Sequence, residues 1–173
     1  MSWRTLGAHV LDAYLDNTIV SGLDRGDLEA EQGASEHLLE LYEQGLVRLF
    51  GSRLILEEIA RAPEEHREGK EAIYRRLLAV QPMPEAEISG VFSARRPFVV
   101  PIVPHRDLEG LRRLLPDNED ARHIHQTALN EIPYFVTTDE RTVLRLASAI
   151  HETCGVTVLR PSAFLEILER RTS

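Results

Sequence analysis

Short apolar segments that alternate with helical patterns are the feature that most constrains how this chain can fold. Four such segments lie at residues 9–15, 46–50, 134–136 and 156–159. Between them, apolar residues recur at the spacing of one helix face, which predicts helices over residues 19–24, 35–44, 53–68, 71–80, 119–130, 140–151 and 162–170. Strands that alternate with helices in this way indicate a mainly parallel sheet covered on both faces. We therefore predict an α/β fold, a three-layer α/β/α sandwich around a central, mainly parallel sheet.

The length and the charge balance limit the class of protein. At 173 residues the chain has the size of one ordinary domain, which we place at residues 1–173. It carries 28 acidic and 20 basic residues, a formal net charge of −8, which argues against non-specific coating of DNA or anionic membranes. The one cysteine, Cys154, excludes an internal disulfide framework, and no stretch approaches the ~20 apolar residues of a membrane span. We expect a soluble cytoplasmic protein with no membrane segment.

Two of the apolar strands lead directly to an acidic residue. Asp16 follows the first strand, and Asp139 follows the strand at 134–136 after two threonines. In a parallel α/β sheet the ligand site lies beyond the carboxyl ends of the strands, so we expect both side chains there. Two further acids, Glu58 on an otherwise apolar helix and Asp120 at the start of another, are placed to join them.

Carboxylates that converge repel one another unless a divalent cation neutralises them. Oxygen ligands together with bound water are what Mg²⁺ or Mn²⁺ prefers. A cation held in this way can activate a water molecule and neutralise charge on a scissile phosphate. The four acids therefore predict metal-dependent hydrolysis of a phosphodiester.

Each acid also has a purely structural explanation. An aspartate at a strand end is often a turn former or a helix N-cap. Glu57 is an alternative to Glu58, because neighbouring helical residues point about 100° apart and only one of them can face the site. Asp117 and Glu119 are alternatives to Asp120, although the spacing to the next acid favours Asp120.

Three further features lie outside the four acids. His123 either contacts a substrate or is a partly exposed helix residue, and we expect the second. The pair Arg95-Arg96, in a loop flanked by glycine and proline with few acids nearby, is the best arginine candidate for phosphate contact. Residues 98–103 form a β-branched run between prolines, which predicts an edge strand.

Four motifs in chain order resemble those of the PIN-domain nuclease family. They are Tyr14-Leu15-Asp16-Asn17-Thr18-Ile19-Val20, Ser52 followed by Glu58-Ile59, Asp120-Ala121-Arg122-His123, and Phe135-Val136-Thr137-Thr138-Asp139. Residues 156–168 are similar to the last strand and helix of the family. The resemblance covers the chain from Tyr14 to about Leu168 and implies a PIN-like form of the predicted sandwich.

The resemblance implies a metal-dependent endoribonuclease of the VapC-like toxin type. In such an enzyme the four acids would hold Mg²⁺ or Mn²⁺, and Thr137 and Asn17 would be supporting residues of the site. RNA is the implied substrate. Many small bacterial members are dimeric toxins held inactive by an antitoxin, so the resemblance also implies a homodimer and an antitoxin partner.

Two other classes of function compete with this hypothesis. A non-catalytic PIN-like module that binds RNA or a protein partner agrees with the acidic charge balance. A haloacid-dehalogenase-like phosphatase shares part of an opening motif with Asp16-Asn17-Thr18, but it needs a second aspartate where Thr18 stands. We therefore do not adopt the phosphatase.

Overall fold

The computed structural model describes residues 10–78 and 106–172. Its strands are β1 (Leu11–Leu15), β2 (Val47–Phe50), β3 (Tyr134–Val136) and β4 (Thr157–Leu159). Its α-helices are α1 (Asn17–Arg25), α2 (Gln32–Glu43), α3 (Arg53–Arg61), α4 (Glu64–Leu78), α5 (Arg106–Leu114), α6 (Asn118–Leu129), α7 (Ala147–Cys154) and α8 (Pro161–Thr172). Two short 3₁₀ helices, η1 (Glu29–Glu31) and η2 (Leu144–Leu146), complete these elements.

The four strands form one parallel sheet in the order β2-β1-β3-β4. The central strand β1 pairs through Ala13 with Leu49 of β2 on one side and with Tyr134 of β3 on the other. Such strands are short and apolar because both faces of a parallel sheet are buried. The predicted α/β fold with a mainly parallel sheet is confirmed for the part of the chain that the structure describes.

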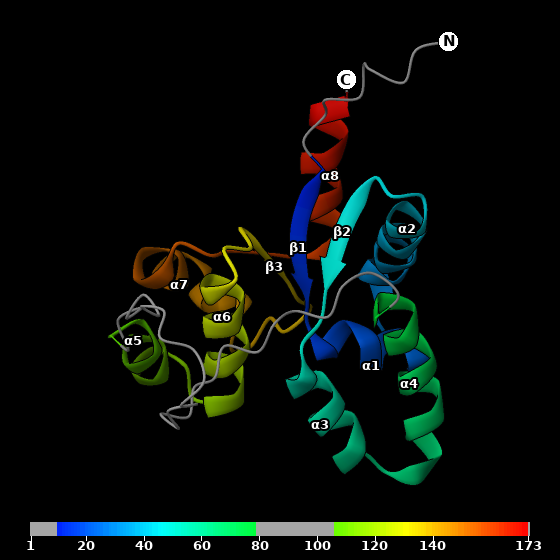
Figure 1. The fold of residues 1–173 in the computed structure, drawn as a ribbon, viewed down its shortest axis with the longest axis horizontal. Helices are drawn as coiled ribbons and strands as arrows, with labels where there is room; N and C mark the ends of the chain where they lie inside the picture. The colour runs from blue at the N-terminus through cyan, green and yellow to red at the C-terminus, as the bar shows by residue number, and fades with distance from the viewer. Residues whose placement is uncertain (1–9, 79–105, 173) are drawn as a thin grey trace, which may run out of the picture.

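Helices cover both faces of the sheet in a three-layer arrangement. The chain moves from β1 to β2 in one direction across the sheet, and from β2 past β1 to β3 and β4 in the other. Because crossovers between parallel strands are right-handed, these two directions place α2 and α6 on opposite faces, while α4 of the second crossover packs against α1. Accordingly, α2 contacts α8, whereas α5 contacts α6 and α7. Figure 1 shows α5, α6 and α7 on one side of the strands and α2 on the other.

Two helices begin directly beyond the carboxyl ends of β1 and β2. Asp16 ends the turn after β1 and caps α1, since its side chain accepts a hydrogen bond from the backbone nitrogen of Asn17. Ser52 caps α3 in the same way, by accepting from the backbone nitrogen of Leu54. Figure 1 shows α1 and α3 just past the arrowheads of β1 and β2. The chain therefore carries polar capping groups to the edge where a ligand site is expected.

The predicted helix over 53–68 is wrong in one respect, because it is two helices. Ala62 has an extended backbone (φ −68°, ψ 154°) between α3 and α4. Pro63 follows it, and the proline ring disfavours the helical conformation of the residue before it. Of the separate helix predicted over 71–80, the residues up to Leu78 belong to the second half of α4, and 79–80 lie outside the described residues.

The predicted helix over 140–151 begins later than expected. The backbone nitrogens of Arg141 and Thr142 both donate to Asp139 Oδ1 at 3.0 Å, which closes a turn in place of a first helical turn. The 3₁₀ helix η2 follows this turn, and α7 then extends to Cys154. Helix α5 was not predicted. The predicted edge strand at 98–103 and the Arg95-Arg96 pair lie outside the described residues.

No helix within residues 10–78 and 106–172 is both long enough and apolar enough to cross a membrane.

Candidate functional site

The four predicted acids line one open cleft at the carboxyl edge of the sheet. The cleft has a volume of about 930 Å³, and Asp16, Glu58, Asp120 and Asp139 all contribute to its wall. They come from four places in the chain: the end of β1, helix α3, the first turn of α6 and the loop after β3. The sheet topology brings these places together, because parallel strands present their carboxyl ends at the same edge.

Asp16 is nearly buried and is held by hydroxyl groups from two segments. Its side chain Oδ2 accepts hydrogen bonds from Thr18 Oγ1 and Thr137 Oγ1, each at 2.7 Å, while Oδ1 accepts from the nitrogen of Asn17 at 2.8 Å. The residue is 6% exposed. Hydrogen bonds to an ionised acceptor are the strong ones, so they set the direction in which this carboxylate faces.

Thr137 connects the ends of β1 and β3. Its hydroxyl donates to Asp16 and accepts from the backbone nitrogen of Asp139 at 3.1 Å, and the side chain is fully buried. Thr138 lines the cleft, whereas Thr137 does not. Thr137, predicted as a site residue, therefore contacts Asp16 from the buried side and does not face the cleft itself.

Asp139 has the local contacts of a turn-forming aspartate. Besides the two backbone nitrogens that donate to Oδ1, the hydroxyl of Thr142 donates to Oδ2. Both oxygens of the carboxylate therefore take part in the turn after β3. The structural explanation that applies to a strand-end aspartate holds here, although the side chain also lines the cleft.

The first turn of α6 distinguishes the three acids that compete for one position. Asp117 caps the helix by accepting from the nitrogen of Glu119 at 2.8 Å, and Glu119 forms an ion pair with Arg61. Within residues 10–78 and 106–172, the side chain of Asp120 makes one hydrogen bond, which it accepts from the hydroxyl of Thr142 at 3.5 Å. The geometry therefore favours Asp120 as the acid of α6 that is available to a ligand.

The pKa of Asp120 is strongly perturbed in the cleft. Burial, together with the negative charges of Asp16, Asp117 and Asp139, raises the pKa of its carboxyl group to about 7. A carboxyl group that holds a proton because of burial and nearby negative charge would release that proton to a divalent cation. This perturbation is typical of functional sites, although ion-pair networks produce it as well.

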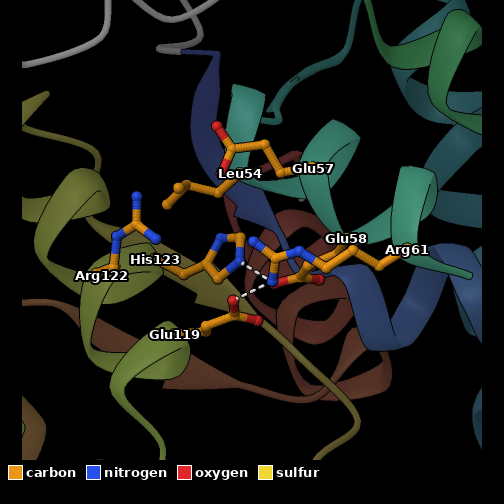
Figure 2. Close-up of a pocket in the computed structure, with 7 residues that line it drawn as sticks. All are labelled: Leu54, Glu57, Glu58, Arg61, Glu119, Arg122 and His123. Carbon is orange, nitrogen blue, oxygen red and sulfur yellow. Dashed lines mark hydrogen bonds and ion pairs between the residues drawn. The ribbon is translucent and has the colours of Figure 1, made fainter.

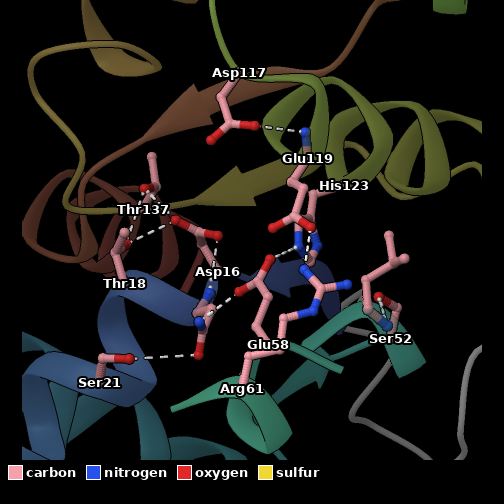
Figure 3. A network of polar contacts seen from close by, with 12 residues as sticks. Asp16, Thr18, Ser21, Ser52, Glu58, Arg61, Asp117, Glu119, His123 and Thr137 are labelled. Carbon is pink, nitrogen blue, oxygen red and sulfur yellow. Dashed lines mark hydrogen bonds and ion pairs between the residues drawn. The ribbon is translucent and has the colours of Figure 1, made fainter. Parts of the chain in front are cut away.

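Glu58 lies between two hydrogen-bonding side chains. Its Oε2 accepts from the side-chain amide of Asn17, and its Oε1 lies 2.7 Å from Nε2 of His123. Figure 3 shows Glu58 near Asp16, with a line of polar contacts leading from Glu58 to His123. The neighbouring Glu57 lines a narrow crevice between α3 and α6 and not the cleft, and in Figure 2 its carboxylate points away from His123. This orientation favours Glu58 over Glu57.

The expectation that His123 is partly exposed is wrong. The residue is 2% exposed, and its Nδ1 lies 2.6 Å from the hydroxyl of Tyr14. Burial alone would lower the pKa of His123, but the hydrogen bond with Glu58 and the charges of Asp16 and Asp120 outweigh burial and raise it. A sequence signal existed, because His123 lies three residues after Asp120 and therefore shares its helix face.

Comparison with known proteins adds no assignment, since no family model, curated protein or solved structure matches the chain.

The chemistry of the donor set fits Mg²⁺ or Mn²⁺, since all four candidate ligands supply carboxylate oxygens. Their arrangement is less complete. Among residues 10–78 and 106–172, no group of three or more His, Cys, Asp or Glu side chains is assembled closely enough to hold a metal ion. Glu58 and Asp139 already accept hydrogen bonds on both oxygens. A metal ion held by the full set therefore requires the carboxylates to move closer together, and on Glu58 and Asp139 it would use the lone pairs that these hydrogen bonds leave open.

Proposed function

We propose that this protein is a metal-dependent endoribonuclease that hydrolyses RNA phosphodiester bonds with Mg²⁺ or Mn²⁺, in a PIN-like fold. The observation that carries the proposal is the convergence of four acids from separate segments on one cleft beyond the strand ends. The raised pKa of Asp120 supports it, because this shift arises partly from Asp16 and Asp139. Capping and turn formation account for Asp16 and Asp139 at the strand ends, but not for Glu58 inside α3 or for Asp120, which does not cap α6.

In this proposal the chain supplies an oxygen-lined site and fixes its most buried ligand. Asp16, Asp120, Asp139 and Glu58 would hold the cation, which supplies an activated water and neutralises charge on the phosphate. Thr18 and Thr137 hold the carboxylate of Asp16 from behind. The hydroxyl of Thr137 also accepts from the backbone nitrogen of Asp139, so one side chain contacts both Asp16 and Asp139.

Three arginines stand among the many acids of the cleft and are the candidates for contact with a nucleic-acid backbone. They are Arg25 at the end of α1, Arg141 in the loop after β3 and Arg160 after β4. Arg25 is paired with Asp27, and Arg160 is paired with Glu140. RNA as substrate, a homodimer and an antitoxin partner belong to the same proposal and are supported by the sequence resemblance.

A non-catalytic PIN-like module that binds RNA or a protein is the second candidate. The observation that favours it is the engagement of Glu58 and Asp139 in local hydrogen bonds, with no assembled metal group among the described residues. Under this alternative the acids shape a binding cleft and a cation is not retained. The phosphatase alternative gains no support, because the side chain at its required second acid, Thr18, donates to Asp16.

Cleavage of RNA by the purified chain tests the proposal. Asp16→Asn keeps a good helix N-cap but removes the anionic charge, so it is expected to abolish metal-dependent cleavage without loss of the fold. Asp12→Asn is the matched control, because Asp12 lies on the same strand and pairs with Arg48 at 2.5 and 2.6 Å outside the cleft. Cleavage that is unchanged in Asp16→Asn, or lost equally in Asp12→Asn, contradicts the assignment.

A further inference from the structure

A buried line of polar side chains runs from the end of β2 to the candidate site. Ser52 Oγ lies 2.7 Å from Tyr14 Oη, Tyr14 Oη lies 2.6 Å from His123 Nδ1, and His123 Nε2 lies 2.7 Å from Glu58 Oε1. Tyr14, Ser52 and His123 are each less than 5% exposed. Figure 3 shows His123 beside Glu58, on the side away from Asp16. None of the first three residues is a candidate metal ligand.

The chemistry of the last contact assigns the hydrogen on the imidazole ring. A carboxylate can only accept a hydrogen bond, so Nε2 of His123 carries a proton and donates it to Glu58. The hydroxyls of Tyr14 and Ser52 can each donate or accept, and together they satisfy Nδ1 in either charge state of the ring. The direction of the His123–Glu58 bond therefore does not depend on the charge of the imidazole.

Aromatic packing holds the imidazole ring in place. The ring of Tyr14 meets His123 edge to face, with centroids 5.8 Å apart and planes at 61°. Tyr14 in turn stacks on Phe135, with centroids 5.4 Å apart and planes at 7°. Since Tyr14 belongs to β1 and Phe135 to β3, the two central strands of the sheet set the position of the donor nitrogen.

Glu58 is consequently held from two helices at once. The imidazole of His123 on α6 holds one carboxylate oxygen, and the amide of Asn17 on α1 holds the other. Glu58 itself is on α3, and its side chain is 19% exposed. Without these hydrogen bonds, the long side chain of Glu58 could adopt several rotamers. Hydrogen bonds from neighbouring residues commonly orient the carboxylates that bind metal ions.

We propose that His123 is a positioning residue that orients Glu58 toward the cleft through a hydrogen bond from Nε2. The consequence for metal binding rests on the proposed function, whereas the orientation of Glu58 does not. The competing explanation is that His123 is a buried histidine whose polar atoms are satisfied and whose loss would affect only the stability of the fold.

A double-mutant cycle on Mn²⁺ affinity separates positioning from stability. His123→Leu removes the donor at similar volume and is expected to raise the Mn²⁺ dissociation constant by about ten- to a hundredfold. In the Glu58→Gln background the same change is expected to have an effect of less than about twofold, because no carboxylate remains to be oriented. His123→Gln, which retains an N–H donor, should recover part of the affinity. An equal loss in both backgrounds, or no loss in either, overturns the proposal.

A matched control and a spectroscopic measurement complete the test. His125→Leu makes the same change at another buried position of α6 and should leave the dissociation constant within about twofold of the unaltered chain. ¹⁵N NMR of the unaltered chain should show a protonated Nε2 of His123 whose N–H signal shifts in Glu58→Gln. An unprotonated Nε2 overturns the proposal even if His123→Leu does not fold. A chain that shows this signal but binds no Mn²⁺ retains the orientation and refutes the proposed function.

Discussion

The hydroxyl of Thr137 offers the sharpest test of how the cleft is built. Thr137→Val preserves the volume of the side chain but removes the donor to Asp16 Oδ2 and the acceptor for the nitrogen of Asp139. A hydrogen bond to a charged acceptor contributes about 1.5–3 kcal/mol, and Thr18 remains to donate to the same oxygen. We therefore expect the free energy of unfolding to fall by about 2–3 kcal/mol. Since the free energy of unfolding falls by about 2 kcal/mol per mole per litre of urea, the urea midpoint should fall by about 1–1.5 M.

The matched control for this change is Thr127→Val on α6. Thr127 is also fully buried, but its hydroxyl donates only to the backbone carbonyl of His123 one turn earlier. Losing such a bond costs little, because the same carbonyl belongs to the helix ladder, so the free energy of unfolding should change by less than about 1 kcal/mol. Urea unfolding followed by circular dichroism measures both variants. Equal midpoints for Thr137→Val and Thr127→Val would refute the claim that the hydroxyl of Thr137 holds Asp16.

Three further predictions address charge and packing. Without metal, Asp120 keeps its proton up to about pH 7 in the folded chain but only up to about pH 4 in the unfolded chain, so the free energy of unfolding should fall as the pH rises between these values. Asp120→Asn should remove this fall, as measured by urea unfolding with a chelator present. An equal fall in the unaltered chain and in Asp120→Asn would contradict the raised pKa. Gly22→Ala places a Cβ 2.1 Å from Leu28 Cδ2, and this overpacking should lower the free energy of unfolding by about 1–3 kcal/mol. An unchanged urea midpoint would show that the side chain of Leu28 moves aside at no cost. Arg141→Gln should weaken RNA binding and reduce the slope of log affinity against log salt concentration by about 1, because one phosphate contact is lost. An unchanged slope would show that RNA does not contact Arg141.

The sheet was predictable because its signal is local. Each strand is a short apolar run bounded by turn residues, and parallel strands need intervening helices, so the parallel sheet and its helical layers followed from the pattern. The strand order β2-β1-β3-β4 was not predicted. The break at Pro63 was equally visible, since a proline disfavours helix at the residue before it, and the prediction passed over it. Helix α5 was missed although Leu108, Leu111 and Leu114 recur at helical spacing, because most of its other residues are charged.

The placement of the four acids was predictable, but their contacts were not. A strand end specifies the edge of the sheet on which Asp16 and Asp139 lie, and nothing in one sequence states which hydroxyls approach them. The link between His123 and Glu58 joins residues 65 positions apart on two helices. Such a pair depends on how α3 and α6 pack, which is a tertiary property. The choice of Asp120 over Asp117 likewise depends on which residue caps α6.

The central claim is that the acids of the cleft bind a divalent cation. Titration of the purified chain with Mn²⁺, followed by electron paramagnetic resonance of the free ion, tests this claim without any assumption about the RNA. We expect saturable binding that weakens by at least about tenfold in Asp16→Asn and is unchanged in Asp12→Asn. No saturable binding, or equal binding by all three chains, would contradict it.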